Sequence, residues 1–340
     1  MTHRRLNIPE IETMAFVALS KAGARAEAAR PLARAVAAAE AEGIASHGLA
    51  YVPVYCEHLL CGKVDGAAVP KAAQPGPATV VVDAATGFAH PAIDLGFAQL
   101  VPLARKMGIA ALAVRNSYNC GVLGYHTDRL AAARLLALGY THAPASIAPV
   151  GGRRAVIGTN PFAVAAPGRD GRIALSIDQS ASVVAKSEIG KHKREGRSIP
   201  SGWAFGPDGE PTTDPDLALK GTMAPSGGYK GFGIGLMVEL LASAASGALP
   251  STEASPFSGT AGGPPRTGQF FIAIDAQSTS GGVFAERVEA LAAAIGDQPG
   301  ARVQGARRAE ARLAAERDGV AVPLELLARI EAICADQTNQ

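Results

Sequence analysis

Gly227-Gly228-Tyr229-Lys230-Gly231-Phe232-Gly233 is the stretch that decides which nucleotide fold the chain can adopt. It is the closest glycine pattern to a dinucleotide-binding fingerprint, and it leads into an apolar run, Gly231 to Ala245, that predicts a helix. No obvious strand precedes it, whereas a Rossmann fingerprint lies between a strand and a helix. Walker A, H-E-x-x-H and G-x-S-x-G motifs are also absent from the sequence. The chain therefore does not fit the common nucleotide-binding and hydrolase folds.

Composition narrows the class of protein further. The chain has 340 residues and a net charge of +2, which allows a sizeable core and gives no global field for nucleic acid or an anionic membrane. No apolar run reaches about 18 residues, and the polar segment Met1 to Pro9 lacks the apolar stretch of a secretion signal. We therefore expect a cytoplasmic protein that acts on a small molecule, with neither nucleic acid nor membrane as a partner.

The cysteines predict neither a metal site nor a disulfide framework. Their spacing fits no zinc or redox motif, so reduced thiols and no bound metal are expected. The four residues are Cys56, Cys61, Cys120 and Cys334.

Helical and strand patterns alternate through the middle of the chain, and both ends read as helical. Apolar periodicity predicts helices over ranges that include Ile8 to Ala22, Arg25 to Glu42 and Val122 to Leu138. Strands are predicted at Ala78 to Asp83, Ile109 to Val114, Ile173 to Ile177 and Phe270 to Ile274. Two long loops, Arg194 to Ala224 and Pro250 to Thr267, are candidate lids or binding segments, with disorder as the alternative for the second.

Ser46-His47-Gly48 lies at a predicted corner between two helices. The glycine lets the backbone bend, which leaves the imidazole free to face a cleft. Histidine can donate a proton near neutral pH, so His47 is a candidate general acid. For the motif taken alone, a capping or buried structural histidine remains the alternative.

Arg115-Asn116-Ser117-Tyr118-Asn119-Cys120-Gly121 follows a predicted strand. The amide of Asn119 can orient a carbonyl group by hydrogen bonding, but it cannot transfer a proton. Asparagine is also common in turns, so a purely structural Asn119 is the alternative.

Two further segments offer polar groups, those of Thr159 and Asn160 being uncharged. Gly158-Thr159-Asn160-Pro161 allows close backbone approach, although it could be only a turn before a strand. Asp178-Gln179-Ser180-Ala181-Ser182 follows a predicted strand and offers N–H groups and hydroxyls to ribose and phosphate. Lys230, at a glycine-rich helix start, is a candidate phosphate neighbour or else a solvated charge.

These segments, in this order and spacing, resemble the malate/L-lactate dehydrogenase family of non-Rossmann NAD(P)-dependent oxidoreductases. That family includes ureidoglycolate dehydrogenase, diketogulonate reductase, sulfolactate dehydrogenase and the piperideine/pyrroline-2-carboxylate reductases. The resemblance runs from about Ile8 to Ile333. It implies an α/β fold with a helical substrate and dimerisation domain, residues 1–75 and 275–340, and an NAD(P)-binding domain, residues 76–274. It also implies a homodimer and NADPH or NADH as the cofactor.

The resemblance assigns roles to individual residues. His47 would supply the proton, and Asn119, the second catalytic residue, would polarise or position the substrate. Substrate would contact Ser46, Tyr51, Ser117 and Thr159. The cofactor would contact Gly158, Asn160, Pro161, Asp178, Gln179, Ser180, Ser182, Tyr229, Lys230, Gly305 and Arg307.

Two departures from the family pattern fall in the substrate region. Asn119 stands where many members have a second histidine, and Tyr51 stands where an arginine would grip a carboxylate. They predict reduction of the C=O or C=N of a small 2-oxo acid or cyclic imine of unusual structure, in a specialised biosynthetic pathway. The alternative is a relative that has lost redox activity and binds a nucleotide or catalyses a non-redox proton transfer.

The other departures fall in the cofactor region. Tyr229 replaces a frequent histidine, and Gln304 and Ala306 replace a proline and a glutamate. Arg307 or Arg308 could meet a 2′-phosphate, which would favour NADPH over NADH.

Overall fold

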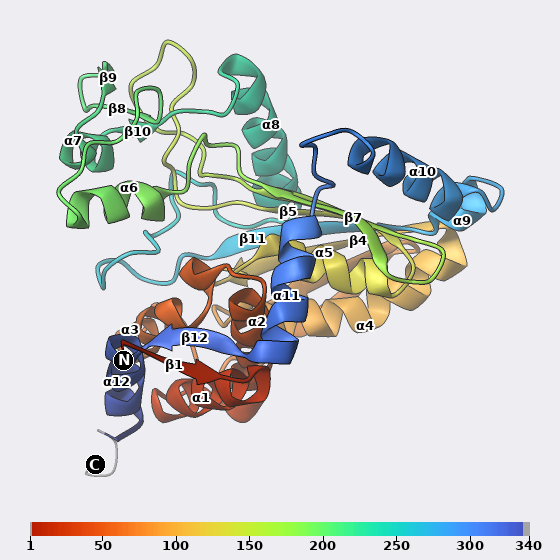
Figure 1. The fold of residues 1–340 in the computed structure, drawn as a ribbon, viewed down its shortest axis with the longest axis horizontal. Helices are drawn as coiled ribbons and strands as arrows, with labels where there is room; N and C mark the ends of the chain where they lie inside the picture. Colours follow the sequence, from red (N-terminus) through yellow and green to blue (C-terminus); the bar gives the residue numbers. More distant parts are fainter. Residues whose placement is uncertain (1, 336–340) are drawn as a thin grey trace.

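The computed structural model describes residues 2–335 and centres on a seven-stranded sheet in the order β2-β3-β4-β11-β5-β6-β7 (Figure 1). Within this sheet β3 and β4 pair in parallel, and every other neighbouring pair is antiparallel. A mostly antiparallel sheet is not a Rossmann sheet, which agrees with the missing fingerprint. The strands, in sheet order, are Lys71–Gly76, Thr79–Asp83, Ile109–Ser117, Thr267–Ile274, Leu136–Thr141, Phe162–Pro167 and Ile173–Gln179.

Two helices cover one face of this sheet. They are α4 (Ala89–Met107) and α5 (Leu123–Ala132), and their apolar sides share a core with β3, β4 and β11. Gly96 on α4 allows the close approach, because a Cβ there would lie 2.5 Å from a methyl group of Leu112. The other face receives α8 (Tyr229–Glu239), which continues as a π-helix, Leu240–Ala245.

The two ends of the chain build a helical part below the sheet in Figure 1. Here α1 (Ile8–Lys21), α2 (Ala26–Ala41) and α3 (Val52–Leu60) pack with α12 (Leu324–Ala335) around one apolar core. Strand β1 (His3–Leu6) pairs antiparallel with β12 (Val320–Pro323), which ties the first described residues to the last helix. Helix α11 (Ala306–Asp318) contacts α2 and runs from the sheet to this part.

A smaller unit forms from residues 186–223, which include most of the predicted loop Arg194 to Ala224. It holds α6 (Lys186–Arg194), α7 (Pro215–Lys220) and a three-stranded sheet in the order β10-β8-β9. Those strands are Thr222–Met223, Ala204–Phe205 and Pro211–Thr212. The remaining helices, α9 (Ala276–Thr279) and α10 (Phe284–Gly296), lie near the β6–β7 side of the large sheet. The division of the chain into domains at residues 75 and 275 stays a prediction.

One predicted helix is wrong. The run Val122 to Leu138 was expected to be helical throughout, but α5 ends at Ala132 and β5 begins at Leu136. Between them Arg134 adopts a left-handed backbone conformation with φ of 65°. The apolar run after it suits a helix and a buried strand equally well, and pairing with β11 and β6 decides for the strand.

The predicted mixed α/β fold is confirmed by this arrangement. No helix among residues 2–335 combines the length and the apolar character needed to cross a membrane.

Candidate active site

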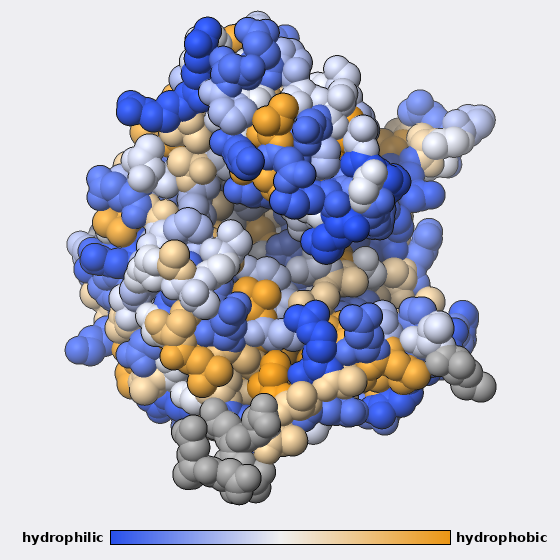
Figure 2. All heavy atoms as spheres, turned by 90° about the vertical axis from the view of Figure 1, so that its left-hand side faces the viewer, coloured by the Kyte–Doolittle hydropathy of each residue, from blue (hydrophilic) through white to orange (hydrophobic). Residues whose placement is uncertain are grey.

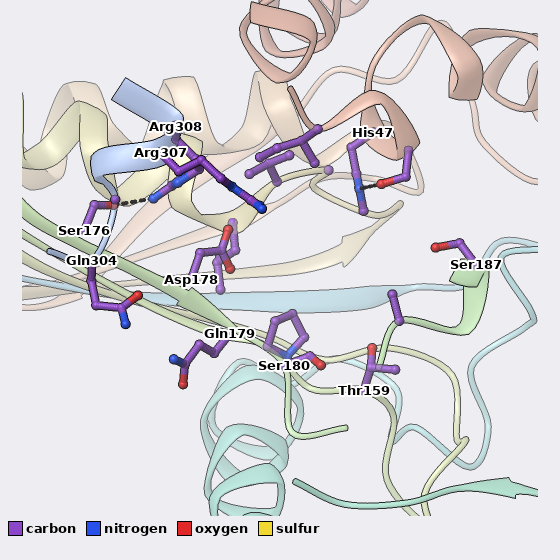
Figure 3. A pocket seen from close by; sticks show the side chains of 18 of the residues that line it. His47, Thr159, Ser176, Asp178, Gln179, Ser180, Ser187, Gln304, Arg307 and Arg308 are labelled. Atoms are coloured by element: carbon purple, nitrogen blue, oxygen red, sulfur yellow. Dashed lines mark hydrogen bonds between the residues drawn. The ribbon is translucent and has the colours of Figure 1, made fainter. Parts of the chain in front are cut away.

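A cavity of about 740 Å³ lies between the helical part and the sheet, within the range of about 300–1,000 Å³ that is usual for ligand sites. Figure 2 shows the molecule hollowed between its upper and lower parts on the face at the left of Figure 1. The cavity brings together residues from distant segments, including the His47 corner, the end of β7 and the start of α11 (Figure 3). Ten of the predicted site residues line it: Ser46, His47, Tyr51, Thr159, Pro161, Asp178, Gln179, Ser180, Gly305 and Arg307.

His47 ends a short 3₁₀ turn, Ala45–His47, at the corner that the sequence predicted. The buried carboxylate of Glu40 accepts a hydrogen bond from the Leu49 amide at 2.7 Å and so holds the next turn in place. Gly48 makes room for that carboxylate, since a Cβ on it would lie 2.4 Å from Glu40 Oε1. The buried Glu40 carboxylate therefore shapes the corner, and Gly48 is needed there because a side chain at this position would collide with that carboxylate.

The imidazole of His47 is exposed to the cavity, and the surrounding protein still lowers its pKa by desolvation. Exposure and desolvation are compatible for a side chain in a hollow, because water reaches one side while protein covers the others. Nδ1 lies 3.1 Å from the Ser46 hydroxyl, which orients the ring (Figure 3). Nε2 is thus the nitrogen that remains for a ligand, and proton transfer at this atom is the chemistry that the geometry allows.

Tyr51 stands beside His47 within a cluster of aromatic rings. The two rings are nearly parallel, at 10° with their centroids 6.4 Å apart, and Tyr55 meets Tyr51 edge-on at 4.7 Å. The Tyr51 hydroxyl donates a hydrogen bond to the backbone oxygen of Phe257 at 3.3 Å. Burial raises the pKa of Tyr51, so its side chain is a neutral phenol.

Phe257 belongs to the second long loop, which is ordered and fastened over this cluster. Lys63 is fully buried, and its ammonium donates to three loop carbonyls, those of Pro256, Gly259 and Ala261, at 2.6, 3.0 and 2.9 Å. His58 Nε2 also lies 3.0 Å from the Gly259 oxygen. We call residues 256–261 the strap. These contacts fix the strap behind Tyr51, in place of the disordered loop that the sequence left as the alternative.

Asn119 lies behind the cavity wall, two residues before the lining residue Gly121. Its side-chain oxygen accepts hydrogen bonds from the Gly121 amide at 3.1 Å and from the Tyr55 hydroxyl at 3.4 Å. This is the local turn that the structural alternative described. A role of Asn119 in orienting the substrate stays a prediction.

The opposite end of the cavity contains charges. Asp178, at the end of edge strand β7, accepts a hydrogen bond from the Gly124 amide in the first turn of α5 at 2.8 Å. Burial raises the pKa of this carboxyl, and the nearby Arg308 partly opposes the rise. A carboxylate at a helix N-terminus is favoured by the helix dipole.

The Arg308 side chain is held by ion pairs and a hydrogen bond within the protein, whereas the Arg307 side chain makes neither with any of residues 2–335. The Arg308 guanidinium lies 3.4 Å from Glu42 and 3.7 Å from Asp128, and it donates to the Ser176 hydroxyl at 2.5 Å. Arg307, next in the chain, is exposed and lines the cavity (Figure 3). Of the two arginines that the sequence left open for a phosphate, the structure leaves only Arg307 available.

Gly305 explains how this segment reaches the cavity. It begins α11 with φ of 92°, and a Cβ there would lie 3.0 Å from the Ser176 side chain. Gln304 accepts a hydrogen bond from the Ser176 amide at 3.1 Å, so the segment runs along the exposed edge of β7. Gln179 and Ser180 line the cavity beside it.

Several predicted contact residues lie outside the cavity lining. Ser117 and Asn160 are buried, and their side chains bond inside the protein, Asn160 to Gly235 and Glu239 at 2.9 and 2.8 Å. A Cβ on Gly158 would lie 2.2 Å from the Ala143 oxygen, so this glycine meets protein backbone. The others in this group are Ser182, whose hydroxyl donates to the Val184 oxygen at 2.7 Å, and the exposed residues Tyr229 and Lys230.

Some cavity residues were not found from the sequence. Ser176 could have been, because it lies two residues before Asp178 on one strand and so on the same face. Lys63, His58 and the strap lie behind Tyr51 and outside the cavity lining, and they offer no such local signal. Their contacts span about 200 residues of chain, such as the separation of 198 from Lys63 to Ala261. Among residues 2–335 no three His, Cys, Asp or Glu side chains are grouped as metal ligands.

One cavity is thus lined by an imidazole and by an arginine without a protein partner among residues 2–335, beside a mostly antiparallel sheet that is not a Rossmann sheet. The family described as malate/L-lactate dehydrogenase matches residues 6–331. The chain therefore belongs to this family, as its motifs predicted, and it is an NAD(P)-dependent dehydrogenase or reductase.

Individual relatives agree with this membership. The chain is 41% identical over 305 residues to (2R)-3-sulfolactate dehydrogenase (NADP(+)) of Chromohalobacter salexigens, covering 90% of this chain and 91% of that protein. It is 38% identical to Delta(1)-pyrroline-2-carboxylate reductase of Ancylobacter novellus, covering 97% of each. The solved structure of delta1-piperideine-2-carboxylate reductase from Pseudomonas syringae pvar. tomato matches with a TM-score of 0.91 at 33% identity, covering 97% of this chain and 99% of that one.

Proposed function

We propose that this protein is an NADPH-dependent reductase that acts on the C=O or C=N group of a small 2-oxo acid or cyclic imine. One observation carries the proposal: His47 and Arg307 line a single cavity, in a chain of this family. The relatives' names include a 2-hydroxy acid, which is the reduced form of a 2-oxo acid, and a cyclic imine, so 2-oxo acids and cyclic imines are the substrates to test first.

The lining residues fit a dinucleotide. Hydroxyl and amide side chains, those of Ser176, Gln179, Ser180 and Gln304, suit ribose and phosphate groups, and the volume is sufficient. Bound NADPH would supply a hydride to the substrate carbon, which the protein itself cannot provide. The chain's own contribution is to orient both molecules and to supply the proton that balances the hydride.

His47 is the proposed proton donor. The Ser46 hydroxyl accepts or donates at Nδ1 and so fixes the ring, while Nε2 can deliver a proton to the substrate oxygen or nitrogen. Desolvation lowers the pKa of this imidazole, which makes the protonated form a stronger acid once it forms. Asn119 and Thr159 are proposed to orient the substrate from the neighbouring walls.

Arg307 supports NADPH over NADH. A free guanidinium can form two parallel hydrogen bonds to a phosphate, and the neighbouring Arg308 is already paired with carboxylates. The 2′-phosphate distinguishes the two cofactors, so Arg307 is the proposed reader of that group.

A homodimer is also proposed. Helix α8 and its continuation expose a group of apolar side chains that a second copy of the chain could cover, consisting of Ile234, Leu236, Met237 and Leu240. Sedimentation of the native protein and of Leu240→Lys tests this, with a shift to monomer expected in the variant. A cytoplasmic location stays a prediction.

The first experiment is a calorimetric titration of the protein with NADPH and with NADH, followed by NADPH oxidation assays with 2-oxo acids and cyclic imines. Tight NADPH binding with weaker NADH binding is expected, together with oxidation that depends on one substrate class. Arg307→Met should abolish the preference for NADPH, and Arg287→Met, at an exposed arginine on α10 outside the cavity lining, is the matched control. Absence of binding by folded protein would refute the proposal.

A further inference from the structure

The Lys63 side chain is fully buried, and its ammonium is satisfied by carbonyl oxygens of the strap. An ammonium has three N–H groups, and three carbonyls meet it, those of Pro256, Gly259 and Ala261, at 2.6, 3.0 and 2.9 Å. Burying this charge costs free energy that an apolar side chain of similar volume would not cost. The arrangement therefore points to a need to hold the strap in one place.

One route of contact from Lys63 to Tyr51 runs along the strap. Phe257 lies next to the held carbonyl of Pro256, and its own backbone oxygen accepts a hydrogen bond from the Tyr51 hydroxyl at 3.3 Å. The Phe257 ring also packs against Tyr118, with the ring centroids 5.8 Å apart. A shift of the strap would therefore move the acceptor of the Tyr51 hydroxyl.

A second route runs through side chains. His58 Nε2 lies 3.0 Å from the Gly259 oxygen that Lys63 also holds, and Nε2 carries the proton because a carbonyl can only accept. Burial, and after it the Lys63 charge, lowers the pKa of His58, which keeps the ring neutral. Nδ1 is then an acceptor, and the Tyr118 hydroxyl donates to it. The hydroxyls of Tyr118 and Tyr51 interact in turn, so this route reaches the same atom as the first.

Both routes end at a side chain that lines the cavity. The Tyr51 ring lies nearly parallel to the imidazole of His47, the proposed proton donor. Its hydroxyl is tied by the two routes and interacts with the Asn119 side chain as well. A substrate bound at His47 therefore lies beside a wall whose place is set from behind.

Resting on the reductase activity proposed above, we propose that Lys63 is a positioning residue of the active site, which fixes Tyr51 through the strap and so sets the affinity for substrate. Lys63 lies outside the cavity lining and acts through other residues. The cofactor contacts proposed for Ser176 and Arg307 belong to β7 and to the start of α11, so NADPH binding should not depend on Lys63.

Positioning can be measured directly by fluorine NMR of protein labelled with fluorotyrosine. The chain has six tyrosines, and Tyr51→Phe identifies the Tyr51 signal. We expect Lys63→Met to shift or broaden this signal and to leave the signal of the exposed Tyr229 in place. Lys106→Met, at an exposed lysine on α4, is the matched control and should change neither signal. An unchanged Tyr51 signal in Lys63→Met overturns the inference.

Kinetics test the effect on substrate, with Δ1-pyrroline-2-carboxylate and pyruvate as the probes. Lys63→Met should raise KM by about tenfold, while kcat stays within about threefold and the Kd of NADPH within about twofold. Tyr51→Phe should also raise KM. Adding it to Lys63→Met should raise KM by no more than about twofold further, because both changes break the same connection. Lys63→Gln keeps two N–H donors and should lie between the native protein and Lys63→Met.

The outcomes separate this inference from the reductase proposal. Additive increases in KM, or loss of NADPH affinity in folded Lys63→Met, would mean a general structural role and overturn the inference. If Lys63→Met does not fold, Lys63→Gln supplies the same readings. Failure of the native protein to bind NADPH overturns the reductase proposal, and the Tyr51 signal then decides by itself whether Lys63 positions that side chain.

Discussion

The two ends of the cavity bury different kinds of side chain. At the Arg307 end, the carboxylates of Glu42 and Asp128 are buried beside Arg308, and all three are held by ion pairs and hydrogen bonds. At the His47 end, Tyr51 packs among neutral rings, and the buried Lys63 ammonium behind them is held by carbonyl oxygens of the strap. Buried charges need specific partners, whereas neutral rings need only packing. The charged end should therefore resist substitution more than the neutral end, and the neutral end should be the place where specificity changes.

Loss of the imidazole should have the largest effect. His47→Gln removes the proton donor but keeps a polar side chain at the corner, so the rate of substrate reduction should fall by about 10²–10⁴-fold. NADPH affinity, measured by calorimetry, should remain within about twofold because the other end of the cavity is unchanged. Unaltered turnover in His47→Gln would exclude His47 as the donor.

The next effect separates two arginines that are neighbours in the chain. Arg308→Met leaves buried Glu42 and Asp128 without their partner, and the free energy of unfolding should fall by about 3–5 kcal/mol. Arg307→Met, at an exposed side chain, should change it by no more than about 0.5 kcal/mol. Denaturant unfolding of both variants measures this contrast. Equal losses of unfolding free energy in the two variants would mean that the buried contacts of Arg308 add no more stability than an exposed arginine does.

The smallest effect is the response to pH. Desolvation places the pKa of His47 below its ordinary value of 6.5, so most of the imidazole is deprotonated at pH 7. Because the donor is the protonated form, the reduction rate should rise as the pH falls and level off below this pKa. The measurement is kcat against pH under saturating substrate, with His47→Gln expected to lose the step. A rate that increases with pH would mean that proton donation by His47 does not limit the reaction.

The order of short motifs along the chain was enough for the family and the fold. His47, Thr159, Asp178 and Gly305 each lie in a motif whose spacing could be read directly, and all four line the cavity. The helix predicted through Leu138 failed because its last residues pair with β11, whose residues lie more than 100 positions later. Such long-range pairing leaves no signal in a local apolar run.

The sequence by itself determined the family, the absence of a Rossmann fold and the corner that presents His47, because glycines and polar residues at set spacings carry these features locally. Only the tertiary structure decided which residues are free to act. It paired Arg308 and left Arg307 in the cavity, occupied the oxygen of Asn119, and used Lys63 to fasten the strap behind Tyr51. The physical reason is that burial and pairing determine what a side chain can bind, and both depend on contacts between distant parts of the chain.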